Sequence, residues 1–175
     1  QMNMGYFNMT LTPKKISVLA MITALTVAIS FFLKIPMPLT KGVVTVLDAG
    51  VIFAALRFGR VEGAIVGGLT GLLFDLLSGY PHWAIFSLLI HGGQGYVAGG
   101  KTNRTLWLVL SGVIMVAGYL LVSWLFYGFG AALADMPGNI IQSIFGVVVA
   151  LTLDGALVKI KEVAEYLRCW GLSGS

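Results

Sequence analysis

The sequence predicts an all-α integral membrane protein with six transmembrane helices and both termini in the cytoplasm. Of its 175 residues, 58% are hydrophobic and only 10% are charged, and the mean hydropathy is +0.93. Soluble domains carry about 25% charged residues, so this inventory cannot cover a water-facing surface. The chain also holds 23 glycines, which suit helices that pack closely within lipid.

Six apolar segments follow one another along a single domain that spans residues 1–175. They are residues 16–33, 46–58, 61–77, 83–99, 106–129 and 139–158. About 20 apolar residues cross the hydrocarbon core, so the second segment needs part of the loop before it. Two prolines end the first segment, and we expect loops over residues 36–46, 79–83 and 128–137. A basic amphipathic tail begins at Lys159.

The basic side chains set the orientation of the six segments. Lys34 and Lys41 fall on one side of this arrangement, and the other nine of the 11 lysines and arginines fall on the side of both termini. Positive charge collects on the cytoplasmic side of membrane proteins, so both termini are expected there. The net charge of +4 is thereby explained by topology, without a nucleic-acid partner. The cell membrane is the expected location.

Small residues recur at every fourth position on two segments, and such faces let helix backbones approach closely. The glycine series is Gly63, Gly67 and Gly71, and the alanine series is Ala20, Ala24 and Ala28. For the glycine series we expect packing inside the protein. The alanine series starts near the cytoplasmic end, where it equally suits docking of a partner's helix.

Isolated polar and aromatic side chains within and beside the apolar segments are the candidate binding residues, because burying polar groups in lipid is costly. The set is Asp48, Asp75, Tyr80, His82, His91, Gln94, Trp124, Tyr127, Asn139 and Gln142. His91 lies eight residues into its segment, and Gln94 follows one turn later on the same face. These groups concentrate in the outer half, where a small heteroaromatic ligand can stack and be hydrogen-bonded.

Several of these residues also have a purely structural interpretation. Asp48 and Asp75 equally suit helix capping or bridging, and Asn139 follows Pro-Gly as an N-cap would. Trp83 suits an anchor at the membrane interface. The two histidines lack an acidic cluster beside them and no Ser/His/Asp arrangement is evident, so we expect no metal, cofactor or catalytic residue.

A formal P-loop match, GYVAGGKT at residues 95–102, offers a nucleotide-binding protein as an alternative. A P-loop needs a preceding strand in a soluble α/β domain, and here Lys101 is explained as a topological charge. A self-contained channel or structural membrane protein is the other alternative.

Three motifs carry a family resemblance: DAGVIFAALRFG at residues 48–59, GAIVGG at 63–68 and DLLSGYP at 75–81. In this order they resemble the S components of energy-coupling factor (ECF) transporters, and the resemblance extends over residues 16–158. It implies a six-helix subunit that binds a vitamin or vitamin precursor from outside. It also implies a membrane T component, which the alanine series would meet, and two cytoplasmic ATPases.

Within that family the chain is most similar to members for hydroxymethylpyrimidine or pyridoxine. An S component for riboflavin, thiamine, folate or pantothenate is the alternative. We expect His91 and Gln94 to hydrogen-bond the ligand and Trp124 or Tyr127 to stack on it. Asn139 and Gln142 would close the far side, beneath the three loops.

Overall fold

The computed structural model describes residues 11–37 and 43–169. Seven helices account for most of them: α1 (Pro13–Phe32), α2 (Leu47–Phe58), α3 (Arg60–Ser78), α4 (Pro81–Ala98), α5 (Arg104–Tyr127), α6 (Phe129–Lys159) and α7 (Lys161–Cys169). Between α1 and α2, the strands β1 (Ile35–Pro36) and β2 (Val43–Val44) pair antiparallel. This short ribbon is the exception to the predicted all-α class, and it lies in the predicted loop over 36–46, of which residues 38–42 fall outside the described residues.

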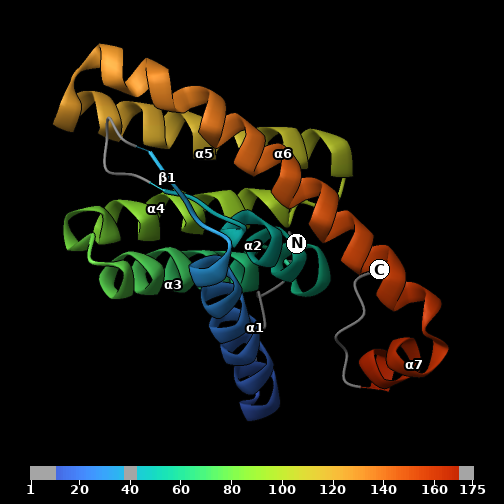
Figure 1. Cartoon of the computed structure of the whole chain (residues 1–175). Helices are drawn as coiled ribbons and strands as arrows, with labels where there is room; N and C mark the ends of the chain where they lie inside the picture. The colour runs from blue at the N-terminus through green and yellow to red at the C-terminus, as the bar shows by residue number, and fades with distance from the viewer. Residues whose placement is uncertain (1–10, 38–42, 170–175) are drawn as a thin grey trace, which may run out of the picture.

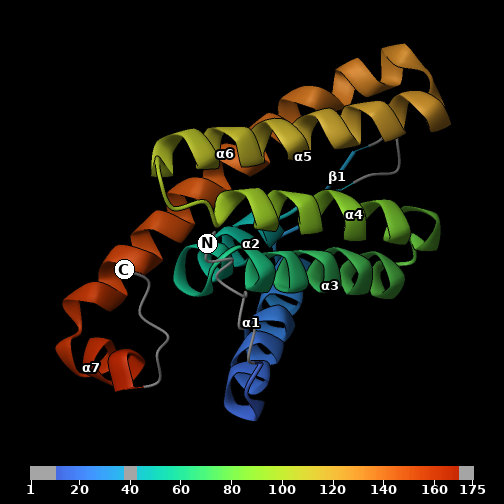
Figure 2. The same ribbon diagram turned by 180° about the vertical axis from the view of Figure 1, so that it is seen from behind.

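Five helices form a closed ring. Each of α2, α3, α4, α5 and α6 contacts the next, and α6 returns to contact α2. Figure 1 shows α3, α4 and α5 as successive layers with α2 beside them. In the described part of the chain α1 contacts only α2 and α3, and Figure 2 shows it projecting away from the other helices. The ring therefore encloses the polar interior, and α1 leaves much of its own surface uncovered.

The surface of the ring is apolar and its interior is polar. Leu89, Leu125 and Ile141 are each more than 60% exposed, whereas Asp48 and Gln94 are completely buried. Soluble proteins rarely expose large contiguous apolar patches. This inverted distribution is that of an all-α membrane protein, as predicted.

Four helices of the described residues are long and apolar enough to cross a membrane: α1, α3, α5 and α6. The other two predicted spans fall short for different reasons. α2 has only 12 residues, about 18 Å of helix. α4 has 18 residues, but its histidines and glutamine lower its hydropathy, and of these His91 and Gln94 are turned toward the interior.

Close packing of α3 on α4 places His91. Gly67 has no side chain, and a Cβ atom there would lie 2.1 Å from the backbone oxygen of His91. Gly63 and Gly71 similarly lie against the backbones of Gly95 and Ser87 on α4. The predicted internal role of the glycine series is thus confirmed. Since ordinary carbon contacts are about 3.5–4.0 Å long, only glycine permits this approach.

The predicted loop over residues 128–137 is wrong. Gly128, with φ of 88°, makes the whole turn, and α6 begins at Phe129 and carries Pro137 inside it. A proline removes one helical hydrogen bond and bends the helix, and the rest of this 31-residue helix continues past it. Asn139 therefore lies within the helix, so the N-cap interpretation of its side chain is also wrong.

Candidate ligand-binding site

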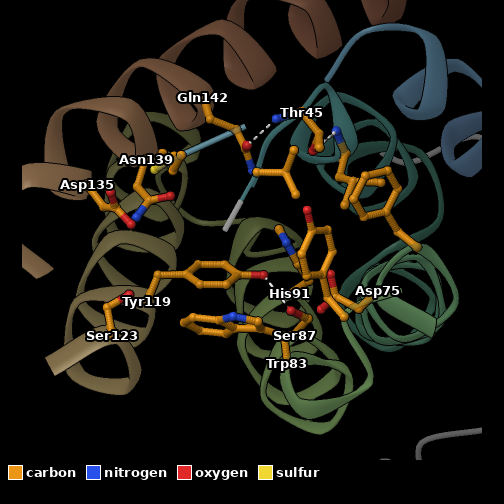
Figure 3. A pocket seen from close by; sticks show the side chains of 15 residues that line it. Thr45, Asp75, Trp83, Ser87, His91, Tyr119, Ser123, Asp135, Asn139 and Gln142 are labelled. Carbon is orange, nitrogen blue, oxygen red and sulfur yellow. Dashed lines mark hydrogen bonds between the residues drawn. The ribbon is translucent and has the colours of Figure 1, made fainter. Parts of the chain in front are cut away.

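A small polar cavity lies at one end of the ring, beneath the β1–β2 ribbon (Figure 3). Its volume of about 30 Å³ has room for about two water molecules. It is lined by Met37, Val43, Thr45, Leu47, Phe74, Asp75, Tyr80, Trp83, Ser87, His91, Tyr119, Ser123, Asp135, Asn139 and Gln142. All five helices of the ring contribute, so the site exists only when the ring is closed.

Behind one wall of the cavity, the buried Asp48 carboxylate joins three helices. It accepts hydrogen bonds from Gln94 Nε2 on α4, at 2.7 Å, and from Gln142 Nε2 on α6, at 3.0 Å. Gln94 Oε1 lies 2.8 Å from His91 Nδ1, and Gln142 Oε1 accepts the backbone N–H of Thr45 at 2.5 Å. A buried carboxylate is stable only when hydrogen-bonded or paired, and these contacts meet that need.

Aromatic rings form the floor of the cavity. Trp83 is only 3% exposed and packs on Tyr119, with ring centroids 5.7 Å apart and the planes tilted by 43°. The Tyr119 hydroxyl lies 2.7 Å from Ser87 Oγ, and Figure 3 shows the two groups meeting beside Trp83. Tyr127 stacks on Trp83 at 6.2 Å and 27°, outside the cavity lining. A flat ring entering the cavity would thus meet flat neighbours.

Two buried polar atoms of the cavity lining lack a hydrogen-bond partner within the described residues. They are Asp75 Oδ2, an acceptor, and Trp83 Nε1, a donor. Buried polar groups are normally satisfied, and an orphaned one costs about 1–3 kcal/mol. An acceptor and a donor left open in one cavity are what a polar ligand would satisfy. Asp135 and Asn139 lie across the cavity from Asp75 (Figure 3).

The ribbon covers this end of the cavity through Met37, Val43 and the following Thr45. A Cβ atom on Gly138 of α6 would lie 2.3 Å from Met37 Cε and 3.0 Å from a methyl group of Val44. The missing side chain at Gly138, next to Pro137, therefore lets the ribbon lie directly on α6.

The ten predicted site residues fall into three groups. Those lining the cavity are Asp75, Tyr80, His91, Asn139 and Gln142; those behind its wall are Asp48 and Gln94; those elsewhere are His82, Tyr127 and Trp124. His82 and Tyr127 hydrogen-bond to each other at 3.0 Å. Trp124 is 52% exposed and its ring packs edge-on against Phe129. The three residues of the last group do not face the cavity.

Trp83, Ser87, Tyr119, Ser123 and Asp135 line the cavity but were not among the predicted residues. The interpretation of Trp83 as an interface anchor is wrong, since its side chain is buried. Helical spacing carried a signal: Trp83, Ser87 and His91 recur every fourth residue on one face of α4. Asp135 was not predicted because it falls in the segment 128–137, which was expected to be a loop and is helical.

The P-loop match does not form a P-loop. Residues 95–98 form the last turn of α4, so the match is preceded by helix and not by a strand. Gly95 packs on Gly63. Asp154, at the end of the last apolar run, contacts Arg57 and Arg104, each at 2.7 Å. Among the described residues no group of three or more His, Cys, Asp or Glu side chains is arranged to hold a metal.

Comparison with known proteins gives the chain a family. The model of the ECF-type riboflavin transporter S component matches residues 10–159. The chain is 43% identical to the thiamine precursor transporter HmpT of Lactococcus lactis subsp. cremoris (strain MG1363), over 80% of this chain and 85% of that one. It is 35% identical to an uncharacterized protein of Pyrococcus woesei, over 69% of this chain and 85% of that one. The chain therefore belongs to the family of ECF-type riboflavin transporter S components, which are multi-pass proteins of the cell membrane.

Proposed function

We propose that the chain binds a thiamine precursor, hydroxymethylpyrimidine, in the cavity beneath the ribbon. The observation that carries the proposal is the open pair of polar atoms, Asp75 Oδ2 and Trp83 Nε1. An aminopyrimidine has an amino group that donates and a ring nitrogen beside it that accepts, so it offers both missing partners. Its flat ring suits the aromatic floor of Trp83 and Tyr119. The similarity to a thiamine precursor transporter supports the same choice.

The size of the cavity favours a small ring over a large one. At about 30 Å³ the cavity must widen even for a pyrimidine, since ligand pockets commonly measure about 300–1,000 Å³. Riboflavin, with three fused rings and a ribityl chain, would require far larger displacement of the same walls. Pyridoxine, a single ring with hydroxyl groups, is the second candidate. Thiamine, folate and pantothenate are less well matched by one small aromatic site.

Ligand identity is tested by mass spectrometry of small molecules released from the detergent-purified protein, followed by titration calorimetry with each candidate. Asp75→Asn and Trp83→Phe each remove or reverse one open group, so each should weaken binding by about tenfold or more. Trp124→Phe is the matched control, because Trp124 lies outside the cavity. A protein that binds none of these vitamins, or that releases ATP, would contradict the proposal.

We further propose a topology and a set of partners. Six spans with both termini in the cytoplasm agree with the basic residues, and α2 and α4 would cross with the help of their flanking turns. The side chains of Ala20, Ala24 and Ala28 are all exposed on α1, outside the ring. They would contact a membrane T component, while two cytoplasmic ATPases supply the energy. The chain itself would carry no catalytic site.

A further inference from the structure

A chain of four hydrogen bonds runs from the backbone of Thr45 to the ring of His91 through Gln142, Asp48 and Gln94. Two arms of donors converge on the Asp48 carboxylate, one from Thr45 through Gln142 and one from His91 through Gln94. The Thr45 backbone N–H can only donate, so Gln142 must present Oε1 to it and Nε2 to Asp48. The carboxylate of Asp48 can only accept, so Gln94 must in turn direct Nε2 toward Asp48.

The last hydrogen bond then determines which nitrogen of the His91 ring carries the proton. With Gln94 Nε2 committed to Asp48, its Oε1 faces His91 Nδ1 at 2.8 Å, and an amide oxygen can only accept. Nδ1 of the imidazole must therefore carry the proton. The Asp48 Oδ1 atom lies 3.7 Å from the same Nδ1, and its negative charge favours a proton on that side. In the neutral ring, Nε2 is left as an acceptor for the cavity that His91 lines.

We propose that Asp48 is a positioning residue that holds His91 as a hydrogen-bond acceptor, so that the site selects ligands presenting a hydroxyl or N–H donor to it. The inference rests on the proposed function for the place of the ligand, and it extends it to specificity. With Asp75 Oδ2 as a second acceptor and Trp83 Nε1 as a donor, the cavity is complementary to a flat ring with two donors and one acceptor. A ligand whose hydroxyl is methylated lacks one donor and binds less tightly.

The structure provides a variant that reverses the two hydrogen bonds between residue 48, Gln94 and His91. In Asp48→Asn, the new side chain has one oxygen and one NH₂ group. Its oxygen accepts from Gln142 Nε2, because Gln142 remains fixed by Thr45. The NH₂ group then faces Gln94, which must flip and present its own NH₂ to His91 Nδ1. His91 changes tautomer, and Nε2 becomes a donor toward the ligand.

A second substitution restores the original direction. In Asp48→Asn combined with Gln94→Glu, the amide NH₂ introduced at position 48 donates to one oxygen of the carboxylate introduced at position 94. The other oxygen of that carboxylate accepts from His91 Nδ1. The total charge is the same as in the wild type. If Asp48 acted only by filling space, adding Gln94→Glu to Asp48→Asn would not restore the original tautomer of His91.

The test reads the tautomer directly by ¹⁵N NMR of histidine-labelled protein, at mildly alkaline pH where free imidazole is neutral. The chain has two histidines, so the spectrum of His82→Gln assigns the signal of His91. We expect a protonated Nδ1 in the wild type, a protonated Nε2 in Asp48→Asn, and a protonated Nδ1 again in the double variant. A protonated Nε2 in the wild type, or an unchanged tautomer in a folded Asp48→Asn protein, would overturn the inference.

Calorimetry with hydroxymethylpyrimidine and its methyl ether supplies the second readout. Wild type and double variant should prefer the alcohol by about tenfold, and Asp48→Asn should lose that preference. If all three proteins preferred the alcohol over the methyl ether to the same degree, the proposed role of Asp48 in selectivity would be wrong. If the wild type binds neither compound but shows the expected tautomers, the positioning role stands and the proposed substrate fails. If Asp48→Asn does not fold, Gln94→Met removes the acceptor for His91 Nδ1 together with one donor to Asp48. It should give a mixture of tautomers, and a single unchanged tautomer there would refute the role of Gln94.

Discussion

Replacement of Gly67 by alanine tests whether the contact between α3 and α4 positions the site. The new Cβ atom would lie 2.1 Å from the His91 oxygen, 2.8 Å from its carbonyl carbon and 2.9 Å from Val51 Cγ1. The backbone oxygen must retreat by more than about 1 Å to reach ordinary contact distance. Overpacking of this kind lowers the free energy of unfolding by about 1–3 kcal/mol. The higher helix propensity of alanine offsets up to about 1 kcal/mol of that loss. We expect a less stable protein with a displaced His91.

Gly93→Ala is the matched control. Gly93 lies on α4 two residues from His91, and its nearest neighbour to a new Cβ is Ile114 Cγ2 at 3.6 Å, an ordinary contact. The two variants should therefore differ by about 2 kcal/mol, or about 4–8 °C in Tm for a chain of this size, measured by tryptophan fluorescence in detergent. Ligand affinity should fall in Gly67→Ala only. Equal Tm and equal affinity in the two variants would refute the idea that this close approach places His91.

Three further predictions concern the rest of the chain. Ala24→Trp should leave ligand affinity unchanged and prevent co-purification of partner subunits; retained partners would remove the alanine series from the interface. Cys169, exposed and the single cysteine of the chain, should react with an impermeant maleimide only after cells are permeabilised, and labelling of intact cells would contradict a cytoplasmic C-terminus. Asp154→Asn weakens ion pairs to Arg57 and Arg104 and should cost about 1–3 kcal/mol of stability, whereas a Tm equal to that of Glu165→Gln would show that the pairs contribute nothing.

The sequence predicts the helices well wherever charge or glycine bounds an apolar run. The predicted segment 61–77 corresponds to α3 (Arg60–Ser78), and 16–33 corresponds to α1 (Pro13–Phe32). It fails at the start of α6, because proline and glycine together are typical of a loop. α6 packs against α2 and α5, and tertiary packing of this kind, which can hold a helix together through a proline, is not visible in a local pattern.

The candidate site was predictable in part, for a related reason. His91 and Gln94 share a face of α4, so helical spacing alone pairs them. The inward face of α5 was missed, although polar side chains mark it: Ser111 and Ser123 are buried, and Tyr119 lies one turn before Ser123. Trp124 and Tyr127 were chosen on that helix, whereas the cavity is lined by Tyr119 and Ser123.

The two sides of the cavity differ in how firmly they are held, and this difference bears on binding and release. The α4 side is fixed by backbone contact at Gly67 and by the hydrogen bonds of the buried Asp48. The ribbon side rests on Gly138 through Met37 and on Gln142 through one backbone N–H of Thr45. Polar groups with fixed directions give selectivity, since they do not rearrange to suit a wrong ligand. We therefore expect the 30 Å³ cavity to widen by displacement of the ribbon. That displacement would release the hydrogen bond from Thr45 to Gln142, whereas Gln94 and His91 would keep the places that Asp48 gives them.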